Sequence, residues 1–270
     1  MLTPRVLFLP STPTLLIDER RGTFTDMLAA FAEQARRFED DEAEAIAIVT
    51  SRWIGTGLFH ADDSRRHTSL IDLPGFGVEP RYDCPGEPAL ARALVERGRR
   101  AGLAVAPARR GADTGVTVPL QLLTSGSRLP VVPISLSDAP AVAHRRWGAA
   151  LRDALETWST RVAFVVTGPL TFSEHDFNLR REVAEDRDLD ARALDALKGK
   201  WRGLGGSRLP AKSHPEANWT HLEVLRGFLG ADVAGRVCAY EALPGIGAAL
   251  AEFPLETGVA APGATQPPAS

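Results

Sequence analysis

The stretch AIAIVTSRW, at residues 45–53, combines a strongly apolar half with a polar end. A short apolar run rich in isoleucine that leads into Thr50, Ser51 and Arg52 is typical of a buried strand opening into a pocket. In α/β sheets, ligands bind beyond the carboxyl ends of the strands. Arg52 therefore stands where site chemistry is usually found. Its guanidinium can hold an anion or a carboxylate, but it cannot be a metal ligand.

Strands and helices alternate on either side of this stretch. Apolar runs predict further strands at residues 6–9, 103–106, 131–136, 161–166 and 237–240. Helical spacing of apolar residues predicts helices at residues 23–40, 88–102, 142–159, 188–201 and 218–229. Thr23 and Thr25 are both candidate N-caps of the first helix. We therefore predict an α/β fold, with a single domain whose mostly parallel or mixed central sheet is flanked by helices on both faces.

The domain is expected to span residues 1–259, and residues 260–270, rich in Pro, Ala and Gly, are expected to form a disordered tail. The 270-residue chain is 44% hydrophobic, enough for a full core. Its net charge of -3 gives no reason to expect nucleic acid or an anionic membrane as a partner. Two cysteines, Cys84 and Cys238, provide neither a disulfide framework nor a Cys-ligated zinc site. The first apolar run is too short for a signal peptide or a membrane span, so we expect a cytoplasmic protein.

Four loops that follow predicted strands carry small and polar residues. They read PSTP from Pro10, TSRW from Thr50, ADTG from Ala112 and GPLTFSE from Gly168. This order resembles the LigB-type (class III) extradiol ring-cleavage dioxygenases, and the similarity covers nearly the whole chain. In that family the loops read P-H-x-P, S-P-H-W, D-H-G and G-x-G-G-[LM]-S-H, and a late acidic residue opens a helix. Two histidines and the late glutamate hold Fe(II) there, leaving open positions for the catechol and O₂.

The resemblance places the two iron histidines on Ser11 and Arg52 and the late glutamate on Asn218, with Glu216 or Glu223 as alternatives. The D-H-G histidine falls on Thr114, and the acid/base histidine falls on Glu174, beside His175. A remnant pocket is thus implied at Ser11, Thr12, Arg52, Trp53, Thr114, Glu174, His175 and Asn218. Serine and asparagine are weak neutral ligands, and Arg52 would put a positive charge where Fe(II) must lie. The resemblance therefore implies no catalytic residue, no metal ligand and no cofactor in this chain.

A chain that keeps the family framework but lacks the iron ligands is similar to the non-catalytic α subunit of 2-aminophenol 1,6-dioxygenases. The corresponding loops of that subunit read S-x-Q-W and D-T-G, and residues 113–115 and the ending at residues 245–253 match its pattern. This similarity implies a homologous catalytic β subunit, in a heterodimer or heterotetramer, that holds Fe(II), binds an aminophenol or catechol and inserts O₂ into the ring. The present chain would stabilise that subunit, and alone it would bind no iron and turn over nothing.

A second hypothesis is a stand-alone pseudoenzyme. Trp53 beside the degenerate site could help bind a small aromatic ligand, or Glu174 and His175 could carry out metal-free chemistry. The former iron cavity itself could be filled by Arg52 paired with Glu174, because an unpaired buried guanidinium is costly. The alternative is that Arg52 points into solvent.

Other polar clusters are given ordinary structural roles. A solvated loop explains His60, Asp62, Asp63 and His67 better than a metal site, because the cluster lacks a distant third ligand. Capping and packing explain His214, Glu216 and His221. The adjacent Ser173, Glu174 and His175 are not a catalytic triad, because neighbouring side chains point apart. The glycines at residues 203–206 lack the strand and spacing of a phosphate loop.

Overall fold

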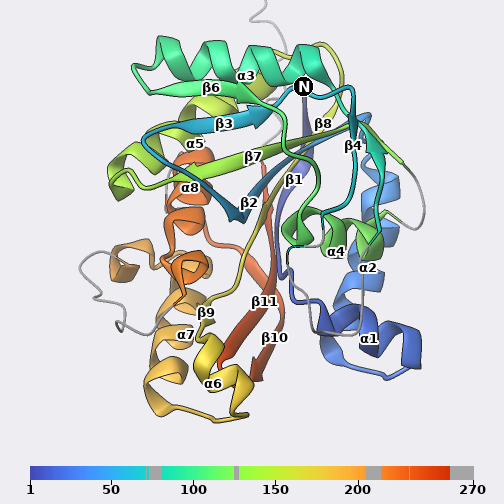
Figure 1. Cartoon of the computed structure of the whole chain (residues 1–270), viewed down its shortest axis with the longest axis vertical. Helices are drawn as coiled ribbons and strands as arrows, with labels where there is room; N and C mark the ends of the chain where they lie inside the picture. Colours follow the sequence, from blue (N-terminus) through green and yellow to red (C-terminus); the bar gives the residue numbers. More distant parts are fainter. Residues whose placement is uncertain (71, 73–80, 125–127, 205–213, 231, 256–270) are drawn as a thin grey trace, which may run out of the picture.

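A central mixed β-sheet organises the computed structural model, which describes residues 1–70, 72, 81–124, 128–204, 214–230 and 232–255 (Figure 1). The expected tail at residues 260–270 lies outside this described part. The strand order is β10-β11-β1-β8-β2-β7-β3-β6, and β9 pairs with β11. These strands are β1 (Leu2–Leu9), β2 (Ala45–Gly55), β3 (Phe59–Asp62), β6 (Val105–Ala108), β7 (Val131–Ser137), β8 (Val162–Thr167), β9 (Thr171–Phe172), β10 (Arg236–Leu243) and β11 (Ile246–Pro254). A separate antiparallel pair is formed by β4 (Arg66–His67) and β5 (Cys84–Pro85).

The four central strands, β1, β8, β2 and β7, run parallel to one another. Antiparallel pairing appears toward both edges, where β11 joins β1 and β3 joins β7. The predicted mixed sheet is therefore confirmed. Because the central strands are parallel, their carboxyl ends lie together at one edge of the sheet, where a site is expected.

Each central strand contributes alternate residues to two separate hydrophobic cores. In β1, Val6 and Phe8 enter one core and Leu7 and Leu9 enter the other. The period of two places successive side chains on opposite faces of a strand, so continuous apolar runs mean burial on both sides. This is why the sequence of the central strands shows no polar alternation.

Helices cover both faces, as predicted. One face is covered by α3 (Pro88–Arg100), α5 (Ala141–Glu156), α7 (Ala184–Leu197) and α8 (Thr220–Leu229). The other face is covered by α1 (Thr14–Arg21), α2 (Asp26–Asp40) and α4 (Thr114–Leu123). The remaining short helices are α6 (Glu174–Asn178), η1 (Trp201–Leu204) and η2 (Pro215–Ala217).

Local sequence explains several of the helix boundaries. The N-cap of α2 is Thr25, whose hydroxyl accepts a hydrogen bond from the Leu28 amide, so of the two candidates Thr23 is not the cap. Pro88 opens α3, as its fixed φ favours at a first helical position. Gly230, with φ of 79°, ends α8 in the left-handed conformation. Within the described residues, no helix is long and apolar enough to cross a membrane.

Candidate functional site

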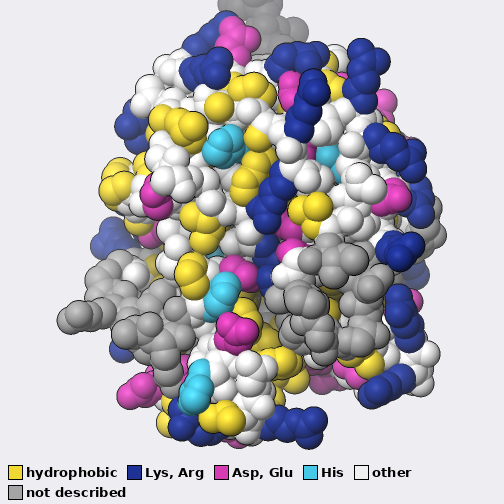
Figure 2. Space-filling view, viewed as in Figure 1, with side chains coloured by type: hydrophobic (Ala, Val, Ile, Leu, Met, Phe, Trp, Pro, Cys, Tyr) yellow, Lys and Arg dark blue, Asp and Glu magenta, His cyan; other side chains and the backbone are white. Residues whose placement is uncertain are grey.

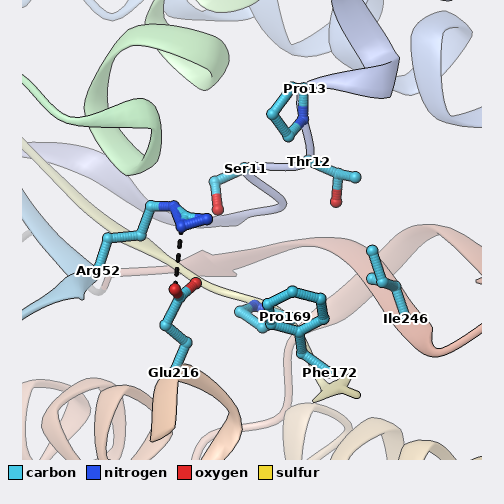
Figure 3. A pocket seen from close by; sticks show the side chains of 8 residues that line it. All are labelled: Ser11, Thr12, Pro13, Arg52, Pro169, Phe172, Glu216 and Ile246. Atoms are coloured by element: carbon cyan, nitrogen blue, oxygen red, sulfur yellow. Dashed lines mark hydrogen bonds and ion pairs between the residues drawn. The ribbon is translucent and has the colours of Figure 1, made fainter. Parts of the chain in front are cut away.

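A pocket opens where the loops after β1 and β8 meet β2, η2 and β11 (Figure 3). The space between its walls is about 320 Å³ when the open solvent at its mouth is included, so the enclosed part is small. Its walls are formed by Ser11, Thr12, Pro13, Arg52, Pro169, Phe172, Glu216 and Ile246. The contributing segments are far apart in the chain, and the parallel strands bring them to one edge of the sheet.

A wide irregularity in β2 positions Arg52. Val49 pairs with Ile134 of β7, and the next pair is Ile54 with Leu136. Four residues of β2, at positions 50–53, therefore face a single residue of β7, whereas the pairing with β8 continues without interruption to Thr50. Extra residues in one strand bend it and redirect its side chains, and such irregularities are frequent next to functional sites. Here the bend brings the Arg52 guanidinium into the pocket.

Arg52 forms an ion pair with Glu216. Its Nη1 donates to Oε1 of Glu216 at 2.9 Å, and the two side chains are only 7% and 11% exposed. Glu216 lies in η2, a single turn that begins at Pro215 and is capped by His214. A second carboxylate, Asp72, lies 3.6 Å from Nε of Arg52. The guanidinium is thus almost fully buried and neutralised by acidic side chains from two other segments.

Burial makes Glu216 a weaker acid than usual. Its pKa is raised to about 7, mainly because burial penalises the carboxylate. Arg52 lowers the pKa, but Asp113 and Asp72 raise it, and the net result is a group that titrates near neutral pH. Burial also raises the pKa of Asp113, to about 6, although Arg110 opposes this shift.

The D-T-G sequence at residues 113–115 joins the site to α4. Thr50 donates to Asp113 at 3.0 Å, and the amide and hydroxyl of Thr114 both donate to Asp72. A Cβ on Gly115 would lie 2.1 Å from the Thr50 hydroxyl, so only glycine allows this close approach. Thr114 therefore holds Asp72 in place instead of facing the pocket.

A buried Asp62–His67 pair fixes the segment that precedes this motif. Asp62 accepts backbone hydrogen bonds from Arg110 and Gly111, and His67 contacts the Val131 carbonyl at 2.8 Å. Burial raises the pKa of Asp62, but hydrogen bonds from His67 and these backbone amides lower it far more. The prediction of a solvated loop is wrong for these two residues, because both side chains are fully buried.

The structure separates the predicted site residues into two groups. Ser11, Thr12 and Arg52 line the pocket together. Trp53 instead stacks on His60, with ring centroids 5.5 Å apart, and Arg110 lies over its ring. Thr114 contacts Asp72, and three more of the predicted residues, Glu174, His175 and Asn218, are exposed outside the pocket wall.

Two details of the predicted site are corrected. Arg52 pairs with Glu216, not with Glu174, because Glu174 begins the exposed helix α6 while η2 points Glu216 at the guanidinium. The acidic residue at the pocket is likewise Glu216 and not Asn218, whose side chain accepts hydrogen bonds from Thr220 at the start of α8. The sequence did contain a signal for this residue: Glu216 is an acidic residue three positions before Trp219, the N-cap of α8.

The structure also identifies site residues that the sequence did not. Asp72 lies in a segment without periodicity, and Arg110 follows a short strand. Phe172 and Ile246 form the apolar wall from β9 and β11, neither of which was predicted as a strand. No local pattern marks these four residues, because long-range contacts position them: Phe172 pairs with Ile246 in the sheet, and Thr114 holds Asp72.

The mixed sheet and the polar cluster at its carboxyl edge define an α/β protein with a strand-end pocket, and the comparisons specify the family. Residues 6–251 match the family model described as the catalytic LigB subunit of aromatic ring-opening dioxygenase. The chain therefore belongs to the LigB family. Dioxygenase tasH of Hapsidospora irregularis is 29% identical over 219 residues, which are 71% of this chain. The alignment spans 65% of that relative, just under two thirds of its length.

A solved structure with the same fold is that of the uncharacterized protein JW3007 from Escherichia coli K12. It superimposes with a TM-score of 0.65, covering 92% of this chain and 98% of the other, at 16% sequence identity. This likeness supports the fold and carries no functional assignment.

The pocket residues of this chain do not fit the ferrous ion that the family resemblance implies. The resemblance places Ser11 and Arg52 at the positions of the two histidines, and in the structure the Arg52 guanidinium is ion-paired with Glu216, the carboxylate in the pocket wall. A cation cannot approach Glu216 while Arg52 neutralises it. Across the described ranges, no three His, Cys, Asp or Glu side chains are grouped so that they could hold a metal ion.

Proposed function

We propose that this LigB-family chain is a non-catalytic subunit of a heteromeric Fe(II)-dependent extradiol dioxygenase. The observation that carries the proposal is the Arg52–Glu216 ion pair. The pair supports a site in which Ser11 and Arg52 would replace the two iron histidines, because the guanidinium charge would repel Fe(II), and the chain matches the LigB family model over residues 6–251. A protein that retains the framework but not the ligands is suited to stabilising a partner.

The proposed partner is a homologous catalytic β subunit that holds Fe(II) and cleaves the ring of an aminophenol or catechol, in a cytoplasmic heterodimer or heterotetramer. The aromatic substrate would reach the complex through that partner. Neither nucleic acid nor a membrane is part of the proposal. On the face drawn in Figure 2, Lys and Arg side chains are interspersed with acidic ones, which supports this view because phosphate binding needs a basic excess.

Co-expression with the genomic neighbour tests the proposal. The lone chain, the lone neighbour and the co-purified pair are compared for iron content and for oxygen uptake with 2-aminophenol and with catechol. Iron and uptake that depend on the pair support the proposal. Stoichiometric iron and turnover in the lone chain would refute it, and so would a neighbour that is equally stable and active alone.

A second candidate, a stand-alone pseudoenzyme, is favoured by the pocket itself. The pocket has an apolar wall and a buried polar pair, which are the usual features of a small-molecule site. A stable homodimer that binds a small aromatic compound without iron would support this candidate over the first.

A further inference from the structure

The two edges of the central sheet differ in how well they are protected. At one edge, β6 has four residues, and one of them is Pro107, which has no amide hydrogen to donate. The Arg99 side chain also donates to the Val105 carbonyl of β6 at 2.8 Å. At the other edge, β10 has eight residues and contains neither proline nor lysine. An open edge strand is a template for another strand, so β10 is the edge at which pairing is expected.

The outer side of β10 is open in the described part of the chain. Helices α2 and α7 pack on its two faces, and β11 pairs along its inner side. Within the described ranges, the backbone groups of residues 237–242 form no hydrogen bond outside that pairing. An edge strand directs alternate amide and carbonyl groups away from its neighbour. These outward groups are therefore available to a second strand.

A bulge places the charged ends of β10 on one face. The pairing with β11 shifts after Val237, where β10 contains one extra residue. Arg236 and Glu241 would lie on opposite faces of a regular strand, and the extra residue brings them to the same face. Arg236 donates to Glu33 of α2 at 3.1 Å. Glu241 accepts from the Met27 amide of α2 at 3.4 Å. A cation and a carboxylate thus mark the two ends of the edge, both on the side of α2.

Helix α2 carries a second set of opposite charges beside this edge. One stripe of its surface, at spacings of three and four residues, is formed by Asp26, Ala29, Glu33 and Arg36. Asp26 and Arg36 are exposed, and neither has an ion-pair partner among the described residues. The stripe therefore has an unpaired carboxylate at one end and an unpaired cation at the other.

Both sets of charges are self-complementary about one axis. If a second copy pairs with β10 in the antiparallel direction, Arg236 can lie opposite Glu241 of the copy. The same rotation brings Asp26 opposite Arg36 of the copy. The two sets share their midpoint, because the N-terminal part of α2 lies at the Glu241 end of β10 and the middle of α2 lies at the Arg236 end. A shared midpoint is what a two-fold axis requires, whereas parallel pairing would set like charges against each other.

We propose that β10 is an interface between two copies of this chain, which pair antiparallel across a two-fold axis and continue the sheet from one copy into the other. The bulge twists the strand and keeps the paired stretch short, so the expected Kd is about 1–100 µM. The inference goes beyond the proposed function, because pairing needs neither iron nor a different subunit. If that function holds, the pair forms the centre of a heterotetramer.

Sedimentation velocity of the purified full-length chain at about 1–500 µM tests the pairing. The dimer fraction should rise over this range, and a monomer at every concentration would overturn the proposal. Hydrogen–deuterium exchange at the two ends of the range locates the contact. Peptides that cover β10 should exchange more slowly at the high concentration, whereas peptides that cover β6 should not change. A dimer without this protection of β10 would place the interface elsewhere and refute the proposal.

Charge substitutions on α2 test the two-fold arrangement. Arg36→Glu sets a carboxylate against Asp26 of the copy at two symmetric places, so the Kd of the dimer should rise at least about fivefold. Asp26→Arg should weaken pairing in the same way. The double variant restores opposite charges and should dimerise nearly as well as wild type. Arg92→Glu is the matched control, because Arg92 is exposed on α3, beside the β6 edge, and it should leave the Kd unchanged.

The outcomes separate this inference from the proposed function. Melting temperatures establish that the variants are folded, as expected for exposed positions. Equal Kd values for wild type and both single variants would disprove the arrangement. A lone chain that stays monomeric, with β10 protected only in a complex with the genomic neighbour, would assign the edge to the other subunit and overturn the proposal. Iron content and oxygen uptake decide the proposed function whichever of these results is found.

Discussion

Arg52 determines the character of the site because its charge cannot be removed by pH. Guanidinium groups stay protonated in proteins, so the carboxylates around Arg52 must adapt to it. Glu216 lies 2.9 Å and Asp72 3.6 Å from the guanidinium. Arg110 and Asp113 form a second ion pair in the same cluster. His214 also lies beside Glu216, 3.4 Å from Oε1. The titration of Glu216 is therefore a direct report on this cluster.

The raised pKa of Glu216 predicts that this residue makes stability fall as pH rises. The folded-state pKa is about 7, above the ordinary value of 4.5, so the folded state keeps a proton that the unfolded state loses between these values. The free energy of unfolding falls by no more than about 3 kcal/mol as the pH rises from 4.5 to 7. Denaturant unfolding of wild type and Glu216→Gln across this range checks it. Parallel pH profiles for the two proteins would contradict the assignment.

A substitution at Gly115 tests the close contact between α4 and β2. An alanine Cβ would lie 2.1 Å from the Thr50 hydroxyl and 3.0 Å from Asp113, so the buried polar contacts must shift. Gly115→Ala is expected to lower the free energy of unfolding by about 1–3 kcal/mol, despite the better helix propensity of alanine. Gly203→Ala is the control, since an added Cβ meets no atom of the described residues within 4 Å. Equal melting temperatures for the two variants would contradict the tight contact.

At this scale the sequence predicted the residues at strand ends better than those in turns. Ser11 and Arg52 could be placed because each lies two or three residues after an apolar run. Glu216 could not be chosen over Asn218, because both lie in a short irregular segment where no periodicity shows which side chain faces inward. One turn of 3-10 helix decides between them, and its packing against β2 and β9 fixes that turn.

At the scale of elements, most of the long predicted helices are confirmed, with shifted ends. The helix predicted at residues 23–40 is α2, and the one predicted at 218–229 is α8, each beginning two or three residues later. The missed strand β11 is rich in alanine and glycine, which have weak strand propensity. It becomes a strand because it pairs with both β1 and β10. Pairing partners of this kind are not encoded in local sequence.

The N-cap of α2 provides a test at the same scale. Thr25→Ala removes the acceptor for the Leu28 amide and should cost about 1 kcal/mol. Thr23→Ala, two residues earlier and exposed, should change the unfolding free energy by less than about 0.5 kcal/mol. Urea unfolding of both variants distinguishes them. A larger loss for Thr23→Ala would move the cap to the other candidate.

Across the whole molecule, Glu252 of β11 connects segments from both ends of the chain. It accepts hydrogen bonds from Arg5 of β1, Arg37 of α2 and Arg236 of β10. Burial raises its pKa, but hydrogen bonds from Arg37 and Arg236 lower it to about 2. Its stabilising effect is therefore present above pH 4.5 and lost as pH falls toward 2.

Glu252→Gln should lower the free energy of unfolding by about 3 kcal/mol at pH 7, because three guanidiniums lose their shared carboxylate. The difference from wild type should shrink as the pH falls below 4.5. Stability measured by urea unfolding at pH 7 and pH 3 checks both points. A difference that stays constant with pH would show that packing, and not charge, explains the loss.

The convergence of distant segments on one pocket predicts that a metal site can be rebuilt. Ser11, Arg52 and Glu216 come from three parts of the chain and line the same cavity. Ser11→His with Arg52→His removes the guanidinium from Glu216 and gives two imidazoles and a carboxylate, the set that non-haem Fe(II) prefers. The double variant should bind about one Fe(II) per chain, whereas each single variant binds far less and the triple variant with Glu216→Gln loses the metal. Metal analysis after anaerobic loading measures this. If the double variant takes up no more iron than wild type, then Ser11 and Arg52 do not occupy ligand positions, and the argument for a degenerate iron site fails with them.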